Sequence, residues 1–199
     1  QLRSSKGDAR FLAGGQSLLA AMKLGLNGAT DLVDLGALPE LSGIKVDGNS
    51  VVVGAMARHA DVASSAEVKR AIPALAALAG SIGDRQVRNM GTLGGSIANA
   101  DPAADYPAAV VGLGATVRTN KREIAADDFF KGFYETALAD DEIVTSVSFP
   151  VPQQAAYVKF KNPASRFALV GVFVAKTQGG VRVAVTGAAG SVFRAAAIE

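Results

Sequence analysis

The sequence predicts an α+β fold, in which helices and strands alternate over about 150 residues and a segment of successive strands follows. Three observations support this class. Residues 44–56, IKVDGNSVVVGAM, hold two β-branched runs around an Asp-Gly pair, which is the pattern of a β-hairpin. An Ala-rich stretch from Asp61 repeats its apolar residues at helical spacing. Beyond residues 150–154, three apolar stretches are separated by turn residues, as in neighbouring strands.

The N-terminal residues predict a strand, a helix and a second strand. Residues 9–13, ARFLA, form a short apolar run that leads into a Gly-Gly turn. After Ser17 the apolar residues have helical spacing, and the glycines at 25–28 end the helix. Residues 30–36, TDLVDLG, alternate apolar and polar residues and predict the second strand.

The central residues begin with the Ala-rich helix, for which Asp61 is the expected N-cap. Pro73 divides this stretch into a first short helix and a second one. Residues 108–119 predict a helix, a turn and a strand, and residues 142–152 predict a strand closed by two prolines. The apolar positions expected to face the core are Val68, Ile72, Leu75, Leu78 and Ile82.

Composition narrows the class of function. The 20 Lys and Arg nearly balance the 18 Asp and Glu, so the net charge of +2 gives no electrostatic footprint for nucleic acid or an anionic membrane. The absence of cysteine excludes thiolate metal sites, iron–sulfur ligation and a Cys nucleophile within these 199 residues, and one histidine excludes a multi-His metal site. No apolar run is long enough to cross a bilayer, so we expect no membrane span and a cytoplasmic location.

Two glycine-rich stretches carry the functional signal: FLAGGQSLL at 11–19 and NMGTLGGSIAN at 89–99. Consecutive glycines let a ligand approach the main chain, and main-chain N–H groups before a helix attract phosphate. Ser17, Thr92 and Ser96 add hydroxyl donors. One such stretch is more often only a turn. Two together favour a site that holds the two phosphates of a dinucleotide such as FAD.

Other nucleotide and nucleophile motifs fail their tests. No P-loop pattern occurs, and in GLGATV at 112–117 Val117 replaces the third glycine of the dinucleotide fingerprint while a strand pattern follows. Neither glycine-rich stretch has the second glycine of a nucleophile elbow. His59 is interpreted as a surface or capping residue rather than a catalytic base.

Residues 86–110, QVRNMGTLGGSIANADPAADYPAAV, are more specific than a Gly-Gly turn. Together with AGGQSL at 13–18 they resemble the FAD-binding medium subunit of molybdenum hydroxylases, the family that includes aerobic carbon monoxide dehydrogenase and xanthine dehydrogenase. Members carry an A-G-G-[HQ]-[ST]-L loop and a T-[IL]-G-G loop, here residues 13–18 and 92–95. The segments DLVDL, IVTSVSFP and KFKNPASRFALVGV are similar as well, so the resemblance covers essentially the whole chain.

The resemblance implies a vanillyl-alcohol-oxidase-like (PCMH-type) FAD-binding fold with two α/β subdomains, followed by an antiparallel α+β subdomain. The FAD-binding domain would be residues 1–152, with a small N-terminal subdomain to about residue 35 and a larger subdomain over 36–152. Residues 153–199 would start the C-terminal subdomain, which we expect to continue beyond Glu199.

The resemblance also implies the cofactor site. The two loops would hold the FAD pyrophosphate through main-chain N–H groups, and Asp105 would accept hydrogen bonds from ribityl or ribose hydroxyls. Alternatively, Asp105 only caps the helix that begins near Pro107. Lys159 would lie near the isoalloxazine edge and favour the reduced flavin, with Phe167 over the ring. The implied cofactor contacts are Ala13, Gly14, Gly15, Gln16, Ser17, Leu18, Thr92, Gly94, Gly95, Ser96, Asn99, Asp105, Ile143, Val144, Lys159 and Phe167.

Electron transfer is the function that the resemblance implies. FAD would take electrons from iron–sulfur clusters on a small partner subunit and pass them to quinone, NAD or oxygen, while a large molybdenum-cofactor subunit oxidises the substrate. We expect such a heterotrimer to dimerise, and we expect neither catalytic residues nor a metal site in this chain. Two alternatives stay open: a free-standing FAD oxidoreductase of the same fold, and a non-catalytic binding or scaffold module.

Overall fold

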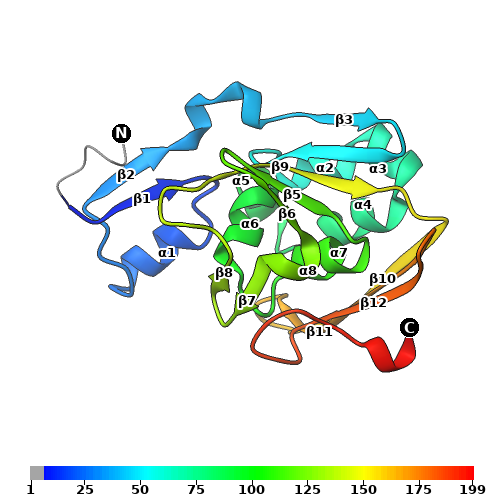
Figure 1. Cartoon of the computed structure of the whole chain (residues 1–199). Helices are drawn as coiled ribbons and strands as arrows, with labels where there is room; N and C mark the ends of the chain where they lie inside the picture. The colour runs from blue at the N-terminus through cyan, green and yellow to red at the C-terminus, as the bar shows by residue number, and fades with distance from the viewer. Residues whose placement is uncertain (1–6) are drawn as a thin grey trace.

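The computed structural model describes residues 7–199, in which a five-stranded sheet, a four-stranded sheet and two small two-stranded sheets surround a group of helices (Figure 1). Residues 1–6 of the predicted N-terminal subdomain lie outside the described residues. The mixture of helices and strands confirms the predicted α+β class.

The N-terminal unit is the predicted strand, helix and strand, and it lies to one side of the five-stranded sheet (Figure 1). Its two strands pair in parallel, with Ala9 opposite Asp31. Its helix has no buried side chain, so its position depends on the loop that precedes it rather than on packing. The elements are β1 (Ala9–Leu12), α1 (Leu18–Lys23) and β2 (Asp31–Asp34).

The five-stranded sheet is antiparallel throughout. The predicted hairpin is confirmed: Asp47 pairs with Ser50, and Gly48 between them has a φ of +57°. In spatial order the strands are β3 (Ile44–Asp47), β4 (Ser50–Gly54), β9 (Val144–Pro150), β5 (Thr116–Thr119) and β6 (Glu123–Ala125).

The Ala-rich stretch forms three short helices, of which only the break at Pro73 was expected. The first helix has Arg58 as its N-cap, and Asp61 lies at the third helical position, where its carboxylate accepts from the Arg58 N–H at 3.0 Å. The prediction of Asp61 as N-cap is therefore wrong by one turn, because the Arg58–Thr92 bridge fixes where the helix begins. A second break falls at Ser65, whose hydroxyl caps the next helix at the Val68 N–H.

The helices of the chain fill the space between the sheets (Figure 1). They are α2 (His59–Ser64), α3 (Ala66–Ala71), α4 (Pro73–Gly80), α5 (Arg85–Met90), α6 (Leu93–Asn99), α7 (Tyr106–Gly112) and α8 (Ala126–Phe129). Short 3-10 turns lie at Leu35–Ala37, Pro39–Leu41 and Ala196–Ile198. Within the described part of the chain, no helix is long and apolar enough to cross a membrane.

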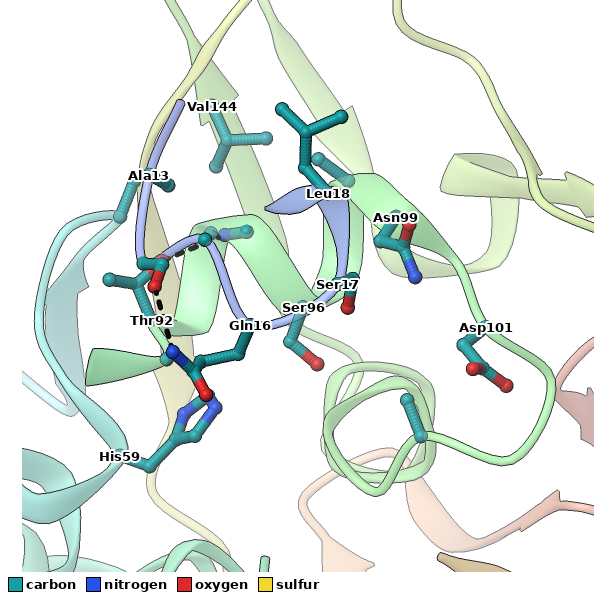
Figure 2. Close-up of a pocket in the computed structure, with 18 of the residues that line it drawn as sticks. Ala13, Gln16, Ser17, Leu18, His59, Thr92, Ser96, Asn99, Asp101 and Val144 are labelled. Carbon is teal, nitrogen blue, oxygen red and sulfur yellow. Dashed lines mark hydrogen bonds between the residues drawn. The ribbon is translucent and has the colours of Figure 1, made fainter. Parts of the chain in front are cut away.

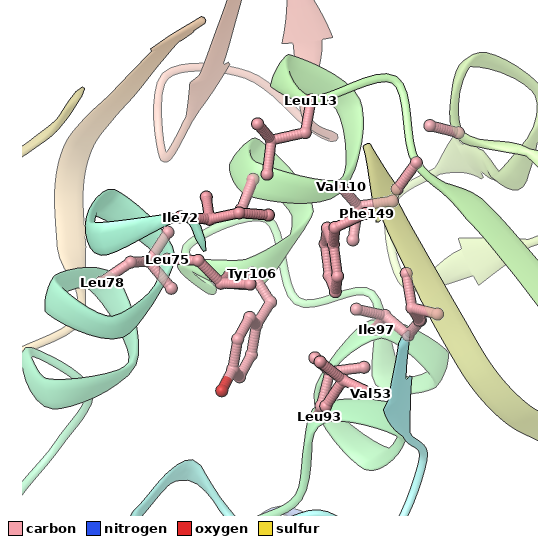
Figure 3. Close-up of a cluster of buried hydrophobic side chains, with 14 of the residues drawn as sticks. Val53, Ile72, Leu75, Leu78, Leu93, Ile97, Tyr106, Val110, Leu113 and Phe149 are labelled. Carbon is pink, nitrogen blue, oxygen red and sulfur yellow. The ribbon is translucent and has the colours of Figure 1, made fainter. Parts of the chain in front are cut away.

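One core joins these helices to the five-stranded sheet (Figure 3). Four of the five apolar positions predicted to face it are fully buried, and Ile82 packs at its edge. The side chains drawn in the core include Val53, Ile72, Leu75, Leu78, Leu93, Ile97, Tyr106, Val110, Leu113 and Phe149. Tyr106 is the one polar side chain labelled in this cluster, and its hydroxyl becomes important below.

The C-terminal residues form the three predicted strands and a short fourth one. Phe173, from the second of them, is fully buried and packs so closely on Gly112 that an added Cβ there would lie 2.8 Å from its ring. The antiparallel strands are β10 (Gln154–Lys161), β11 (Ala168–Thr177), β12 (Gly180–Thr186) and β13 (Phe193–Arg194). A separate hairpin consists of β7 (Phe130–Gly132) and β8 (Glu135–Thr136).

Candidate functional site

A cavity of about 480 Å³ lies between the loop after β1, helices α5 and α6, and the loop before β9. Figure 2 shows side chains from these three regions facing a common space. Every predicted cofactor contact lines this cavity except Lys159. Two stretches that are far apart in the sequence, residues 13–18 and 92–99, therefore lie close together and line one cavity.

The first glycine-rich loop presents unused main-chain donors. None of the N–H groups of residues 14–18 donates a hydrogen bond to any residue between Gly7 and Glu199. Gly15 has a φ of +70°, which the loop needs in order to turn into α1. A Cβ on Gly14 would overlap the Met90 carbonyl oxygen, so this glycine lets the two loops touch. A run of free N–H groups at a helix start attracts an anion.

The second glycine-rich loop uses its main-chain donors internally. Leu93 and Gly94 donate to Ala57 and Ala55 at 3.0 and 2.8 Å. Gly95 donates to the Thr92 hydroxyl at 3.1 Å and Ser96 to the Thr92 carbonyl at 3.0 Å. The loop was expected to offer N–H groups, but those of residues 93–96 are occupied. The half-buried side chains of Ser96 and Asn99 are what it presents to the cavity (Figure 2).

Asp105 forms a buried cluster with two residues of β10. Its carboxylate accepts hydrogen bonds from the Tyr157 hydroxyl and from Lys159 Nζ, the latter at 2.9 Å. The Asp105 and Lys159 side chains are only 5% and 6% exposed. Burial raises the pKa of Asp105, while the hydrogen bond from Tyr157 and the charge of Lys159 oppose that rise. The carboxylate makes no cap bond to α7, so the alternative that Asp105 merely caps this helix is wrong.

Lys159 reaches the cavity only through Asp105. It pairs with that carboxylate and lies 3.4 Å from the Ser81 carbonyl oxygen, on the far side of the wall. Ile143, Val144 and the half-exposed Phe167 line the cavity directly and give it an apolar section. The predicted aromatic and aliphatic residues therefore line the cavity, whereas the predicted cation does not and pairs with Asp105 instead.

His59 is the main residue that the sequence analysis misplaced. It lines the cavity and is only 5% exposed, so the prediction of a surface residue is wrong. Its Nδ1 atom has no hydrogen-bond partner among the described residues. Burial, with a contribution from the Arg88 charge, lowers its pKa to about 4. A lone histidine gives no sequence signal for this, because the strand-like bridge between Arg58 and Thr92 that places it is not a local feature.

Further lining residues were not predicted because they belong to no recognisable motif. Arg88 donates to the Ile82 and Gly83 carbonyl oxygens at 3.0 and 3.3 Å and so holds the turn before α5 against the cavity. The hydroxyl of Tyr134, in the turn between β7 and β8, donates to the Asp101 carboxylate after α6 at 3.1 Å. Arg88 and Tyr134 thus support lining residues without lining the cavity themselves, and the unpredicted residues that do line it include Arg10, Phe11, Met56, Val87, Leu138, Glu142, Ser165 and Arg166.

Free N–H groups, hydroxyls, an apolar section and a buried carboxylate suit an elongated ligand with a diphosphate and a flat ring. The fold and the site thus define a dinucleotide-binding flavoprotein. Residues 1–152 match the family described as the FAD binding domain in molybdopterin dehydrogenase, and the chain belongs to that family. Its cofactor is FAD, and it is the flavoprotein part of an oxidoreductase of the molybdenum hydroxylase type.

Similar proteins and structures agree with this family. The carbon monoxide dehydrogenase medium chain of Hydrogenophaga pseudoflava is 38% identical over 94% of this chain and 69% of its own length. The glyceraldehyde dehydrogenase medium chain of Sulfolobus acidocaldarius is also 38% identical, over 96% and 72%. A solved Cu,Mo-CO dehydrogenase structure matches with a TM-score of 0.90 and 35% identity, covering 96% of this chain and 71% of that one.

Proposed function

We propose that this chain holds FAD in the cavity between its two glycine-rich loops and relays electrons within a molybdenum hydroxylase complex. The observation that carries this is the run of unpaired N–H groups over residues 14–18 at the cavity wall. Such a run leaves several main-chain donors open to one acceptor from outside the loop, and a pyrophosphate is a suitable acceptor.

The chain's own residues divide the work of binding. The first loop donates main-chain N–H groups to the pyrophosphate, and Ser17, Ser96 and Asn99 add side-chain donors. Ile143 and Val144 supply the apolar surface for the flavin ring. When bound, FAD supplies the redox chemistry, and the residues around it set its position and electrostatic surroundings. Lys159 contributes its charge through Asp105, which it holds at 2.9 Å.

The proposal includes partners, because the chain holds no cysteine with which to ligate an iron–sulfur cluster. We propose that a small iron–sulfur subunit delivers electrons, that a large molybdenum-cofactor subunit oxidises the substrate, and that quinone, NAD or oxygen accepts the electrons. The names of similar proteins, such as medium chain and medium subunit, support a place in an assembly. We also propose the PCMH-type layout, with FAD-binding residues 1–152 and a C-terminal subdomain starting at residue 153.

Titration of the purified chain with FAD tests the cofactor site. Quenching of flavin fluorescence should saturate, and ADP should compete because it carries the same diphosphate. Ser96→Phe should abolish binding, since the new ring would fill the cavity. Ser64→Phe is the matched control at an exposed position of α2, and it should bind FAD as the wild type does. FAD binding that survives Ser96→Phe would place the cofactor elsewhere.

Affinity purification from the source organism tests the relay. The chain should bring down a cysteine-rich subunit and a larger one, and the eluate should contain iron and molybdenum. A flavin-loaded chain that purifies alone and reduces its FAD with its own substrate would instead support the free-standing oxidoreductase.

A further inference from the structure

A polar pair that the proposed function does not use begins at the cavity wall: His59 lines the cavity, and Tyr106 packs behind it in the core. His59 Nδ1 and the Tyr106 hydroxyl are both buried, and neither has a hydrogen-bond partner among the described residues. Their rings lie 5.3 Å apart with a tilt of 50°. An unpaired buried polar group destabilises a folded protein, so two of them close together beside a cavity need an explanation.

We propose that His59 is a further contact for the phosphates of the bound dinucleotide and that the Tyr106 hydroxyl positions it. This inference rests on the proposed function, since it assigns the histidine to the same ligand. In it, His59 Nε2 donates a hydrogen bond to a phosphate oxygen, and Tyr106 donates to His59 Nδ1 directly or through one water molecule. Both orphaned groups then have partners.

Placement supports a phosphate contact rather than a contact to either ring system of the ligand. The His59 backbone N–H donates to the Gly91 carbonyl oxygen at 3.0 Å, which ties the residue to the start of the second loop. From the other side, Gly14 packs on Met90 and Gly91. His59 therefore lies where the two loops meet, and Figure 2 shows its ring next to the Gln16 side chain of the first loop.

Gly91 lets the imidazole edge pack close to the main chain of the second loop. A Cβ at this position would lie 2.5 Å from His59 Nε2 and 2.9 Å from Cδ2, so any side chain there would displace the ring. Gly91 has a φ of −61°, which any residue can adopt, so its backbone does not require glycine. Glycine is required here because the imidazole edge approaches the main chain so closely.

The charge states suit this arrangement. The lowered pKa of His59, about 4, keeps the imidazole neutral at physiological pH, with one N–H and one acceptor nitrogen. Burial, assisted by the charges of Asp105 and Asp61, raises the pKa of Tyr106, so its hydroxyl stays protonated and can donate. A donor at Nδ1 fixes the tautomer that carries its proton on Nε2, toward the ligand.

Because His59 is the only histidine in the chain, nitrogen NMR of protein labelled at histidine reports on it alone. The wild type should show the Nε2–H tautomer, and FAD or ADP should shift the Nε2 resonance while riboflavin and adenosine should not. His59→Leu should lower the affinity for FAD and for ADP about tenfold or more, as expected for losing a hydrogen bond to a charged group. Tyr106→Phe should weaken them less and mix the two tautomers.

A matched glycine pair separates space from fold. Gly91→Ala should weaken ADP binding as His59→Leu does. Gly28→Ala should leave ADP binding unchanged, because a Cβ added at Gly28 would have no other atom within 4 Å. Wild-type protein that fails to bind FAD at all would refute the proposed function. FAD binding with an unmoved His59 resonance and unchanged affinity in His59→Leu would refute this inference alone. A resonance that moves with riboflavin or adenosine would also overturn the phosphate assignment.

Discussion

The two glycine-rich loops have nearly the same letters, AGGQSL and TLGGSI, but the protein holds them in opposite ways. In the first, the N–H groups of residues 14–18 have no described partner, and α1 buries no side chain. In the second, the N–H groups of residues 93–96 are all bonded, and α6 buries Leu93, Gly94 and Ile97. The same motif thus offers its main chain to a ligand in one place and to the protein's own core in the other.

The second stretch is also anchored at its far end. Asp105, which ends the segment after α6, is held by Tyr157 and Lys159 from β10. Residues 11–19 hold no charged side chain for a comparable anchor, and within the described residues Gly14 of this stretch contacts Met90 and Gly91. We therefore expect changes in the second stretch to lower the stability of the whole fold, and changes in the first to act mainly on FAD affinity.

Asp105→Ala should have the largest effect. It leaves the Lys159 ammonium 6% exposed without its partner, and breaking a buried pair in this way costs about 3–5 kcal/mol. Urea unfolding of the flavin-free protein measures this loss. Asp105→Asn keeps an acceptor for Tyr157 and should lose less. Equal stability of Asp105→Ala and the wild type would show that the second stretch is not anchored here.

Acid should weaken the fold through His59, which packs behind the second loop. The unfolded chain takes up this proton near pH 6.5, but the folded protein does so only near pH 4. Stability that is complete above pH 6.5 is therefore lost as the pH falls toward 4, by about 3 kcal/mol. His59→Leu should flatten this part of a stability-against-pH curve. An unchanged slope in the variant would mean that other groups cause the acid loss.

Gly94→Val and Gly15→Val separate two roles of glycine: close packing in the core at Gly94 and a left-handed backbone turn in the first loop at Gly15. A Cβ on Gly94 would lie 2.5 Å from the Ala55 Cβ and 2.8 Å from its carbonyl oxygen, so we expect a loss of about 2–3 kcal/mol of stability from overpacking. A Cβ on Gly15 meets the movable end of Leu19 at 2.8 Å, and the strain of φ +70° costs about 1–2 kcal/mol in a loop with little packing. Thermal unfolding should separate the variants, and Gly15→Val should still lose FAD.

The sequence predicted the elements well where the signal was local, as in the hairpin around Gly48 and the break at Pro73. Nearly all of the cofactor contacts predicted from the two specific loop motifs line one cavity in the structure. The sequence did not reveal which loop has free N–H groups. That depends on the carbonyl oxygens of Ala55 and Ala57, which accept from the second loop and lie far from it in the sequence. The burial of His59 was mispredicted and the ion pair between Lys159 and Asp105 was not foreseen for the same reason: burial and partners come from distant segments.

The smallest expected effect compares the hydroxyls at the two helix starts. Thr92 accepts from the Gly95 N–H at 3.1 Å and is 4% exposed, whereas Ser17 at the N-cap of α1 makes no side-chain cap bond. Thr92→Val keeps the shape, removes the acceptor and should cost about 1 kcal/mol of stability. Ser17→Ala should change stability by less than about 0.5 kcal/mol, because no folded-state bond is lost.

FAD reverses this order. With saturating FAD, the melting temperature of the wild type should rise because the ligand binds only the folded state. The melting temperature of Ser17→Ala should rise less, because this variant lacks the hydroxyl that contacts the ligand. Thr92→Val should keep most of the gain, since its hydroxyl already serves Gly95. If Ser17→Ala loses stability without FAD, or Thr92→Val loses the FAD-dependent gain instead, then the loops are not divided between ligand and core as their hydrogen bonds indicate.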